Sequence, residues 1–389
     1  MTQGINESLW LLVSSVLAMV AIIGVALFYG GMVRRKNVVN TIGMPFAAIV
    51  MVSLEWLCFG DRLVYGYDGP EGSGLGAGAR SLLPLYHAMT ASLALGLVAG
   101  GIVERVHFLF FLVFGLLWTA FVHGPLAFWL WGDGWLAKLG SLDFAGGSVI
   151  HISAGVAALV AAVVIGPRRG YGRVEMMPNH LPMSFLGVGL MWVGWFGFAA
   201  GPRLAPMTTV AGAFVAIQLS CVAAALSWMT VEWVQRDKPT ALGVASGAVA
   251  GLVAITPGAG YVAPLSAVVI GIGAGGLCYM VVNYVKLILG YDDALDVFGM
   301  HGVGGLWGMI ATGLFASTEA NPDGSDGLFY GYPYQFFAQL VAALAVTAFV
   351  GAMTFLLLKG LSVILPPRVN EEAEAMGLDL AQHGEKGYS

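Results

Sequence analysis

The sequence predicts an all-α polytopic membrane protein, and three observations lead to this fold class. The 389 residues are 58% hydrophobic and only 10% charged. Their apolar runs approach or exceed the ~20 residues that a helix needs to cross a bilayer. The 56 glycines agree with this prediction, because small residues let helices approach closely where lipid removes the hydrophobic drive between them.

Eleven transmembrane helices are expected, each from one apolar run. In chain order they lie near residues 9–31, 40–60, 85–103, 108–129, 145–166, 181–200, 208–232, 241–256, 262–283, 297–316 and 334–358. The first run has no small-residue cleavage site, so we expect a retained helix rather than a signal peptide. These helices make up one transmembrane domain, 1–367, and a polar, acidic tail follows at 368–389.

Basic residues predict the orientation of this bundle. With the N-terminus outside, 13 of the 17 Lys and Arg residues fall on the cytoplasmic side and four outside. This bias follows the positive-inside rule. We therefore expect a plasma (inner) membrane protein with its N-terminus outside and its C-terminal tail in the cytoplasm.

Two histidines lie within stretches that are otherwise apolar, His151 in the fifth expected helix and His301 in the tenth. An ionisable residue in a membrane span indicates a functional site, and each histidine is the obvious polar partner of the other. Their separation of 150 residues suggests an inverted five-helix repeat plus one extra helix, with the site between the halves. Asp143, eight residues before His151, could cap the fifth helix, and Asp296 opens the second histidine segment.

The three cysteines, Cys58, Cys221 and Cys278, show no ligand spacing and cannot all pair. We expect them to pack rather than to form disulfides or a metal site.

At this point the chain resembles the ammonium transporter family (Amt/Mep/Rh), whose signature runs through the segment from Asp143 to Gly155. The resemblance covers essentially the full chain. It continues through Phe28-Tyr-Gly-Gly-Met-Val33, Glu104-Arg105, Trp129-Leu-Trp-Gly132, Gly194-Trp-Phe-Gly197, residues 246–257, Asp296-Val-Phe-Gly-Met-His301-Gly302, and the tail segments Gly377-Leu-Asp379 and His383-Gly-Glu385.

The resemblance implies a homotrimer in which each subunit has its own narrow central pore, lined by a twin-histidine pair at His151 and His301. Ammonium resembles potassium in size and charge, and dehydrating either cation in an apolar pore is very costly. Ammonium can lose a proton and cross as ammonia, which potassium cannot do. Imidazoles suit this chemistry because one ring nitrogen donates while the other accepts.

The outer mouth is expected to recruit the cation with aromatic faces. By resemblance, Trp131 is the vestibule tryptophan and Phe198 one of two stacked gate phenylalanines, with Asp143 nearby. Several positions depart from the family. Thr90 stands where the other gate phenylalanine is usual, Tyr86 at a further phenylalanine position, and Pro202 at a vestibule serine. The segment Asp61-Arg62 replaces an uncharged pair, and Glu55 adds a carboxylate.

With Thr90 in place of a ring, the pore beneath Trp131 is expected to be less occluded, with Phe198 as the main barrier.

Three functions stay open. The first is ammonium transport. The second is an ammonium sensor that conducts poorly and signals through the tail to a PII-type protein or a fused signalling domain; no kinase-like or cyclase-like segment is present in these residues. The third is a redox or metal protein, for which ligand spacing is lacking. No enzyme activity, cofactor or nucleic-acid partner is expected.

Overall fold

The computed structural model describes residues 2–66, 77–200 and 207–388. Pro202, predicted to replace the vestibule serine, lies outside these residues. The all-α prediction is confirmed, since the described residues form helices and turns, with only two isolated β-bridges, Val106 to Arg368 and Val262 to Ala316.

The described residues in the first half of the chain form twelve helical elements in order. They are α1 (Thr2–Met32), η1 (Arg35–Asn37), α2 (Val38–Glu55), η2 (Trp56–Gly60), α3 (Asp61–Tyr65), α4 (Ala77–Ile102), α5 (Phe108–Trp118), η3 (Thr119–His123), α6 (Gly124–Trp131), α7 (Trp135–Lys138), η4 (Gly147–Ile152) and α8 (Ser153–Ile165).

The second half continues with the same kinds of element and ends in the tail. These are α9 (Leu181–Ala200), α10 (Met207–Arg236), α11 (Ala241–Ile255), α12 (Pro264–Met280), η5 (Val281–Val285), α13 (Lys286–Leu289), η6 (Phe298–Gly302), α14 (Val303–Phe315), η7 (Leu328–Tyr330), α15 (Pro333–Leu361), α16 (Glu371–Met376) and α17 (Leu378–His383).

Nine of the eleven expected spans coincide with helices in the described residues that are long and apolar enough to cross a membrane. The other two are shorter as regular helices. One is α11, of 15 residues. The other is divided into η6 and the 13-residue α14. The count of eleven therefore stays a prediction, while the polytopic helical class is established.

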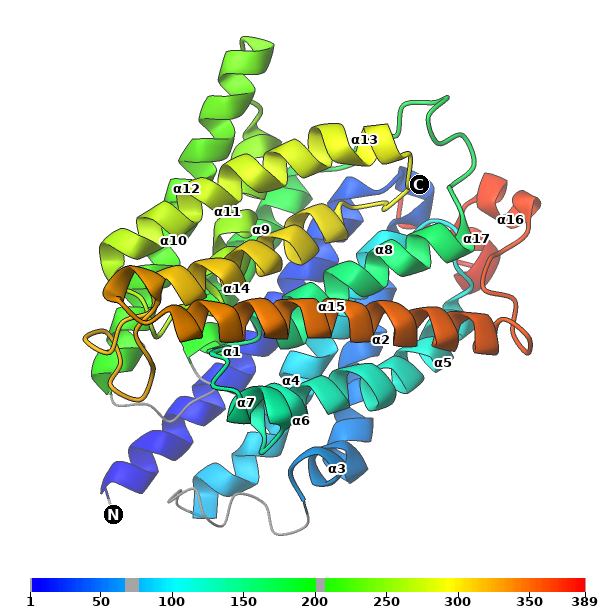
Figure 1. Cartoon of the computed structure of the whole chain (residues 1–389). Helices are drawn as coiled ribbons and strands as arrows, with labels where there is room; N and C mark the ends of the chain where they lie inside the picture. The colour runs from blue at the N-terminus through cyan, green and yellow to red at the C-terminus, as the bar shows by residue number, and fades with distance from the viewer. Residues whose placement is uncertain (1, 67–76, 201–206, 389) are drawn as a thin grey trace.

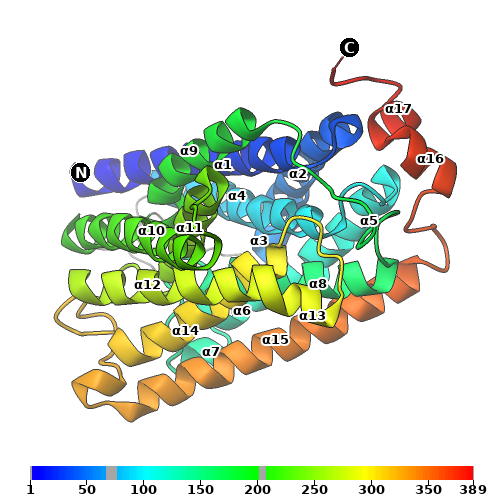
Figure 2. The same cartoon turned by 90° about the horizontal axis from the view of Figure 1, so that it is seen from above.

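The long helices run roughly together from one end of the bundle to the other (Figure 1). Helix α1 packs against α9 and α4, and α10 packs against α11 and α12. Helix α15 covers one side of the bundle, as the view from above makes plain (Figure 2). The tail helices α16 and α17 lie at the end opposite the N-terminus in both views.

Five of the η elements are π-turns, which are rare in helices and concentrate at functional sites. Two of them carry the predicted histidines, because His151 lies in η4 and His301 in η6. Gly155 lets these segments approach. A Cβ atom there would lie 2.2 Å from the backbone nitrogen of Gly302, so any side chain would push η6 away from α8.

Candidate functional site

The rings of His151 and His301 meet in the middle of the bundle. Their Nδ1 atoms are 3.2 Å apart, and the ring centroids are 5.2 Å apart with 26° between the planes. Both residues are buried, with exposed fractions of 0% and 4%. The predicted pairing of the two rings is therefore confirmed.

One hydrogen must lie between the two Nδ1 atoms, because two lone pairs would repel each other. In the neutral pair one ring then has a protonated Nδ1 and a free Nε2 acceptor, while the other has a protonated Nε2. The pair thus offers one donor and one acceptor to a small polar solute. His151 Nε2 has no hydrogen-bond partner among the described residues, so it is available for such a contact.

Trp195 fixes the His151 ring. Its indole lies parallel to the imidazole, at 5.1 Å between centroids and 6° between planes. The indole nitrogen donates to Thr256 Oγ1 at 3.1 Å, which holds the stack in place. Trp195 belongs to the motif Gly194-Trp-Phe-Gly197, but its contact with His151 was not predicted from the sequence. A contact between α9 and η4 has no signal in the residue pattern.

Asp143 caps the helix that carries His151, as predicted. Its two carboxylate oxygens accept from the backbone N–H groups of four residues at 2.6–3.3 Å: Gly146, Gly147, Ser148 and Val149. Its own carbonyl accepts from Trp131 Nε1 at 3.0 Å. The backbone carbonyl of Asp143 therefore orients the Trp131 indole in the predicted vestibule. The carboxylate of Asp143 caps the helix that carries His151.

Asp293 has the matching place in the second half. It lies eight residues before His301, the spacing between Asp143 and His151, and its Oδ2 accepts from the Phe298 N–H at 2.7 Å. Burial raises the pKa of Asp293 to about 6, with the nearby charges of Lys286 and Asp296 acting in opposite directions. The predicted opening residue, Asp296, instead pairs with Lys286 Nζ at 2.6 Å. The repeated spacing was the signal that could have identified Asp293.

Aromatic rings stand between the histidines and the end of the bundle that carries Trp131, which we call the tryptophan mouth. The Phe198 ring is edge-on to His151 at 6.2 Å and to Trp195 at 4.8 Å. The Tyr86 hydroxyl donates to the Phe198 carbonyl. Phe198 and Tyr86 are fully buried.

Thr90 adds no ring to this group, since its hydroxyl donates to the His87 carbonyl of its own helix at 2.9 Å. Tyr86 is four residues earlier on α4 and keeps an aromatic side chain beside Phe198. Tyr86, rather than Thr90, therefore supplies the aromatic side chain of α4 beside Phe198.

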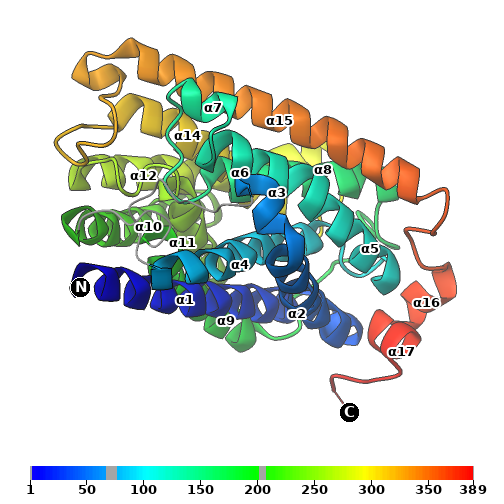
Figure 3. The same ribbon diagram turned by 90° about the horizontal axis from the view of Figure 1, so that it is seen from below.

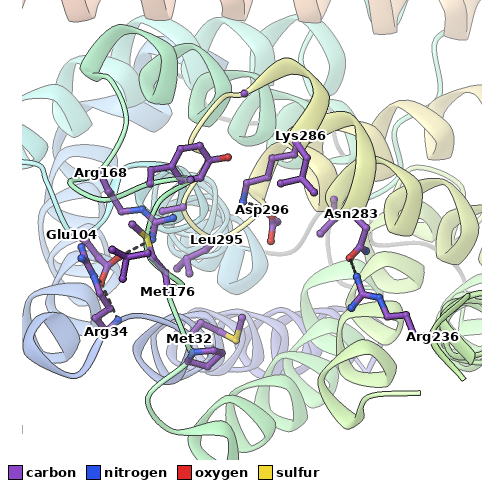
Figure 4. Close-up of a pocket in the computed structure, with 18 residues that line it drawn as sticks. Met32, Arg34, Glu104, Arg168, Met176, Arg236, Asn283, Lys286, Leu295 and Asp296 are labelled. Atoms are coloured by element: carbon purple, nitrogen blue, oxygen red, sulfur yellow. Dashed lines mark hydrogen bonds and ion pairs between the residues drawn. The ribbon is translucent and has the colours of Figure 1, made fainter. Parts of the chain in front are cut away.

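A cavity of about 640 Å³ lies at the other end of α8 (Figure 4). Arg168 binds Glu104 at 2.6 Å and Asp292 at 2.7 Å beside it, and the Lys286–Asp296 pair lies across it. The segment from Gly147 to Ile165, of 19 residues, separates this cavity from the tryptophan mouth by about 28 Å at 1.5 Å per residue. The two histidines lie between the two ends.

The tail folds back on the rest of the same chain next to this cavity. Asp379 Oδ1 accepts from the Asn40 backbone N–H at 2.8 Å, and Lys36 Nζ donates to the carbonyls of Glu374 and Ala375. Arg169 contacts the tail residue Glu374 through its backbone N–H. Arg168 instead binds the buried carboxylates of Glu104 and Asp292.

The three cysteines are free.

The fold and the buried site together define a multi-pass helical membrane protein with a polar pair inside an apolar bundle. The chain belongs to the Ammonium Transporter Family, whose family model matches residues 9–388. The family predicted from the sequence motifs is thereby confirmed.

Curated relatives cover nearly the whole chain. It is 45% identical over 381 residues to an ammonium transporter of Bacillus subtilis, covering 94% of each protein. It is 40% identical over 388 residues to ammonium transporter Amt1 of Archaeoglobus fulgidus, covering 98% of each.

Solved structures agree with the fold. Candida albicans Mep2 superimposes with a TM-score of 0.87 at 33% identity, covering 98% of this chain and 90% of that chain. A sensor Amt protein has a TM-score of 0.89 at 24% identity, covering 98% of this chain and 99% of that one. The second likeness concerns the fold alone.

Proposed function

We propose that this protein passes ammonium across a membrane by deprotonating it at one mouth and conducting ammonia past His151 and His301. The observation that carries the proposal is the 3.2 Å contact between the two Nδ1 atoms in an otherwise apolar bundle. Membership of an ammonium transporter family supports the substrate. Potassium cannot follow, because it has no proton to give up.

Recruitment takes place at the tryptophan mouth, which the proposal places outside. A cation over an aromatic face gains about 0.5–2 kcal/mol, more where water is excluded. The hydrogen bond from Trp131 to the Asp143 carbonyl keeps the indole in one orientation. Phe198 is the next barrier, with Tyr86 fixed to its backbone.

The histidine pair then receives the neutral solute. Ammonia has one lone pair and three N–H bonds, so it can accept from a protonated Nε2 and donate to a free one. These are the two groups that a neutral Nδ1–Nδ1 pair presents. Ammonia leaves towards the cavity with Arg168 and Asp296, where water returns a proton.

The remaining features belong to the same proposal. Residues 1–367 form the conducting domain and residues 368–389 a cytoplasmic regulatory tail. The assembly is a homotrimer in the plasma membrane, with one pore per subunit and the N-terminus outside. The tail is the contact point for a PII-type signalling protein.

Flux across liposomes on a solid-supported membrane tests the proposal. An ammonium jump should produce a transient current or an internal pH change, and an equal potassium jump should produce neither. His151→Ala and His301→Ala should abolish the response while leaving the unfolding temperature nearly unchanged, because Ala adds no buried charge. A wild-type response to potassium equal to that to ammonium would contradict the proposal.

A sensor is the second candidate, and Thr90 favours it, because one gate ring is missing. The docked tail offers a route by which occupancy could reach a partner. Ammonium binding measured by calorimetry with no flux in the liposome assay would favour this candidate.

A further inference from the structure

A second group of titratable side chains lies beside the tryptophan mouth. It consists of Asp61, His87, His123 and Glu55. The rings of His87 and His123 are both edge-on to the Trp56 indole, Asp61 pairs with His87, and Glu55 accepts from Thr119 Oγ1. Figure 3 shows α3, which carries Asp61, close to α4, which carries His87, and to α6, which follows His123. His123 and Trp56 are buried with exposed fractions of 0% and 2%, and His87 has 8%. The π-turns η2 and η3 supply Trp56 and His123.

Asp61 and His87 form a carboxylate–imidazole dyad. The His87 Nδ1 lies 2.9 Å from Asp61 Oδ1, and the Tyr65 ring stacks on the imidazole at 4.6 Å and 27°. With the Nδ1 hydrogen donated to the carboxylate, Nε2 is left as an acceptor in a fixed orientation. This is the arrangement that makes an imidazole a general base, because the carboxylate is the counter-charge when the ring is protonated.

His123 lies deeper, between the dyad and the helix of His151. Its ring is edge-on to Trp56 at 5.5 Å and lies near the backbone of Val149, two residues before His151. Both ring nitrogens of His123 and the indole nitrogen of Trp56 lack hydrogen-bond partners among the described residues. Orphaned buried groups of this kind are costly unless water or another polar ligand completes them.

Among the residues that the structure describes, none provides the central histidine pair with a comparable counter-charge. The Asp143 oxygens are occupied by four backbone N–H groups, and Asp293 accepts from the Phe298 N–H. A proton left on the central pair would therefore be a charge in an apolar interior without a carboxylate in contact, which is very unfavourable. At the dyad the carboxylate is in contact and is itself partly exposed, with 18% of its side chain accessible.

We propose that the Asp61–His87 dyad, connected through His123 and ordered water, is the base that takes the proton from ammonium at the tryptophan mouth. This inference rests on the proposed function. An N–H bond of ammonium breaks and leaves its electron pair on nitrogen as ammonia. The proton passes along water to His87 Nε2, forming an imidazolium. The Asp61 carboxylate stabilises this imidazolium at Nδ1, the Nε2 proton then passes to outside water, and the starting tautomer with a free Nε2 is restored.

The position of α4 agrees with this role. His87 follows Tyr86, whose hydroxyl is bound to the carbonyl of the barrier residue Phe198. Other groups that face the dyad are Tyr65 on α3, His123 on η3 and the indole of Trp56. The Glu55 carboxyl is held at 2.6 Å by Thr119 Oγ1 and adds a second acid to the group.

Transport kinetics test the dyad. Asp61→Asn and His87→Gln should lower the maximal ammonium flux by about tenfold or more, as expected for loss of a general base, with little change in half-saturating ammonium. The difference in flux between the wild type and these variants should be largest at an outside pH of about 6. It should shrink in alkaline solution, because ammonia is already present there. Asp133→Asn, on an exposed loop at the same end, is the matched control and should behave as wild type. Wild-type flux and pH profile in both dyad variants would overturn the proposal.

A second measurement needs no transport. In purified protein without ammonium, nitrogen-15 NMR of the histidine rings should show rapid hydrogen exchange between the His123 ring and water, slowed by His87→Phe. Failure of the proposed function would appear as absent wild-type flux with this exchange retained. Slow exchange at His123 in the wild type would refute the hydrated relay, even if ammonium flux were normal.

Discussion

The indole of Trp195 and the imidazole of His151 lie parallel, 5.1 Å apart, and this stack determines the orientation of one member of the central pair. Trp195→Leu removes the flat surface, so the His151 ring gains freedom to turn away from His301. We expect ammonium flux to fall by about ten- to hundredfold, the cost of a misplaced reacting group. The rise in internal pH of liposomes after an ammonium jump measures this effect.

Thr256→Val is the control, since it removes the hydrogen bond to the indole and keeps the volume. Its effect should be smaller. Equal currents in Trp195→Leu and wild type would mean that neighbouring side chains alone fix the ring.

Much of this architecture could be predicted from the residues, because hydropathy and buried histidines are local signals. The eight-residue spacing from acid to histidine occurs in both halves. Asp296 was nevertheless predicted as the opening acid, although Asp293 has the matching spacing. The structure separates their roles, because Asp296 has φ of +60° and its carboxylate pairs with Lys286.

Contacts between helices could not be predicted from the sequence, for a different reason. The stack of Trp195 on His151 and the dyad of Asp61 with His87 depend on how neighbouring helices cross, which no single apolar run encodes. Hydropathy also did not predict that residues 297–316 divide into the π-turn η6 and the helix α14, because both segments are apolar.

Thr90→Phe tests the altered gate. If the missing ring limits recruitment or closure, this substitution should raise ammonium-dependent flux. The bond from Tyr86 to the Phe198 carbonyl leads us to expect no more than a twofold change, because an aromatic side chain already stands there. Tyr86→Ala should have the larger effect. A strong gain from Thr90→Phe in the liposome assay would show that Tyr86 does not compensate.

Arg168 neutralises two buried carboxylates, those of Glu104 and Asp292. Arg168→Met leaves both acids without this partner, and breaking a buried ion pair in this way costs about 3–5 kcal/mol. We expect a large fall in the free energy of unfolding, measured in detergent by denaturant titration. Arg173→Met, on an exposed loop, should change it little.

The same cluster predicts how stability depends on pH. Burial alone would raise the pKa of Glu104, but the charges and hydrogen bonds of Arg168 and Arg34 outweigh it and bring the pKa below its ordinary 4.5. A depressed pKa stabilises the folded state fully above the unfolded value, and this contribution disappears as the pH falls through the folded value. The unfolding temperature should therefore drop between pH about 5 and 3, and Glu104→Gln should show a weaker drop.

The tail is the last element to be tested. It is bound to the N-terminal end of α2. Asp379 Oδ1 accepts from the Asn40 N–H at 2.8 Å, and Asn37 Oδ1 accepts from the Leu378 N–H. Asn37 also donates to Glu104, which links the tail to the Arg168 cluster beside the cavity. Removing residues after Pro367 should loosen this segment and lower ammonium flux several-fold, while ammonium binding at the tryptophan mouth stays nearly intact.

Hydrogen–deuterium exchange of residues 34–40 and the internal pH change of liposomes after an ammonium jump measure the two effects. Tyr388→Phe loses only the hydroxyl contact with Asn179, so it is the matched control and should leave both unchanged. Individual surface contacts of this kind are worth only about 0–1 kcal/mol, so the buried Asp379 contact should dominate, and Asp379→Ala should reproduce most of the truncation. Equal exchange and equal flux with and without the tail would show that it is not coupled to the pore.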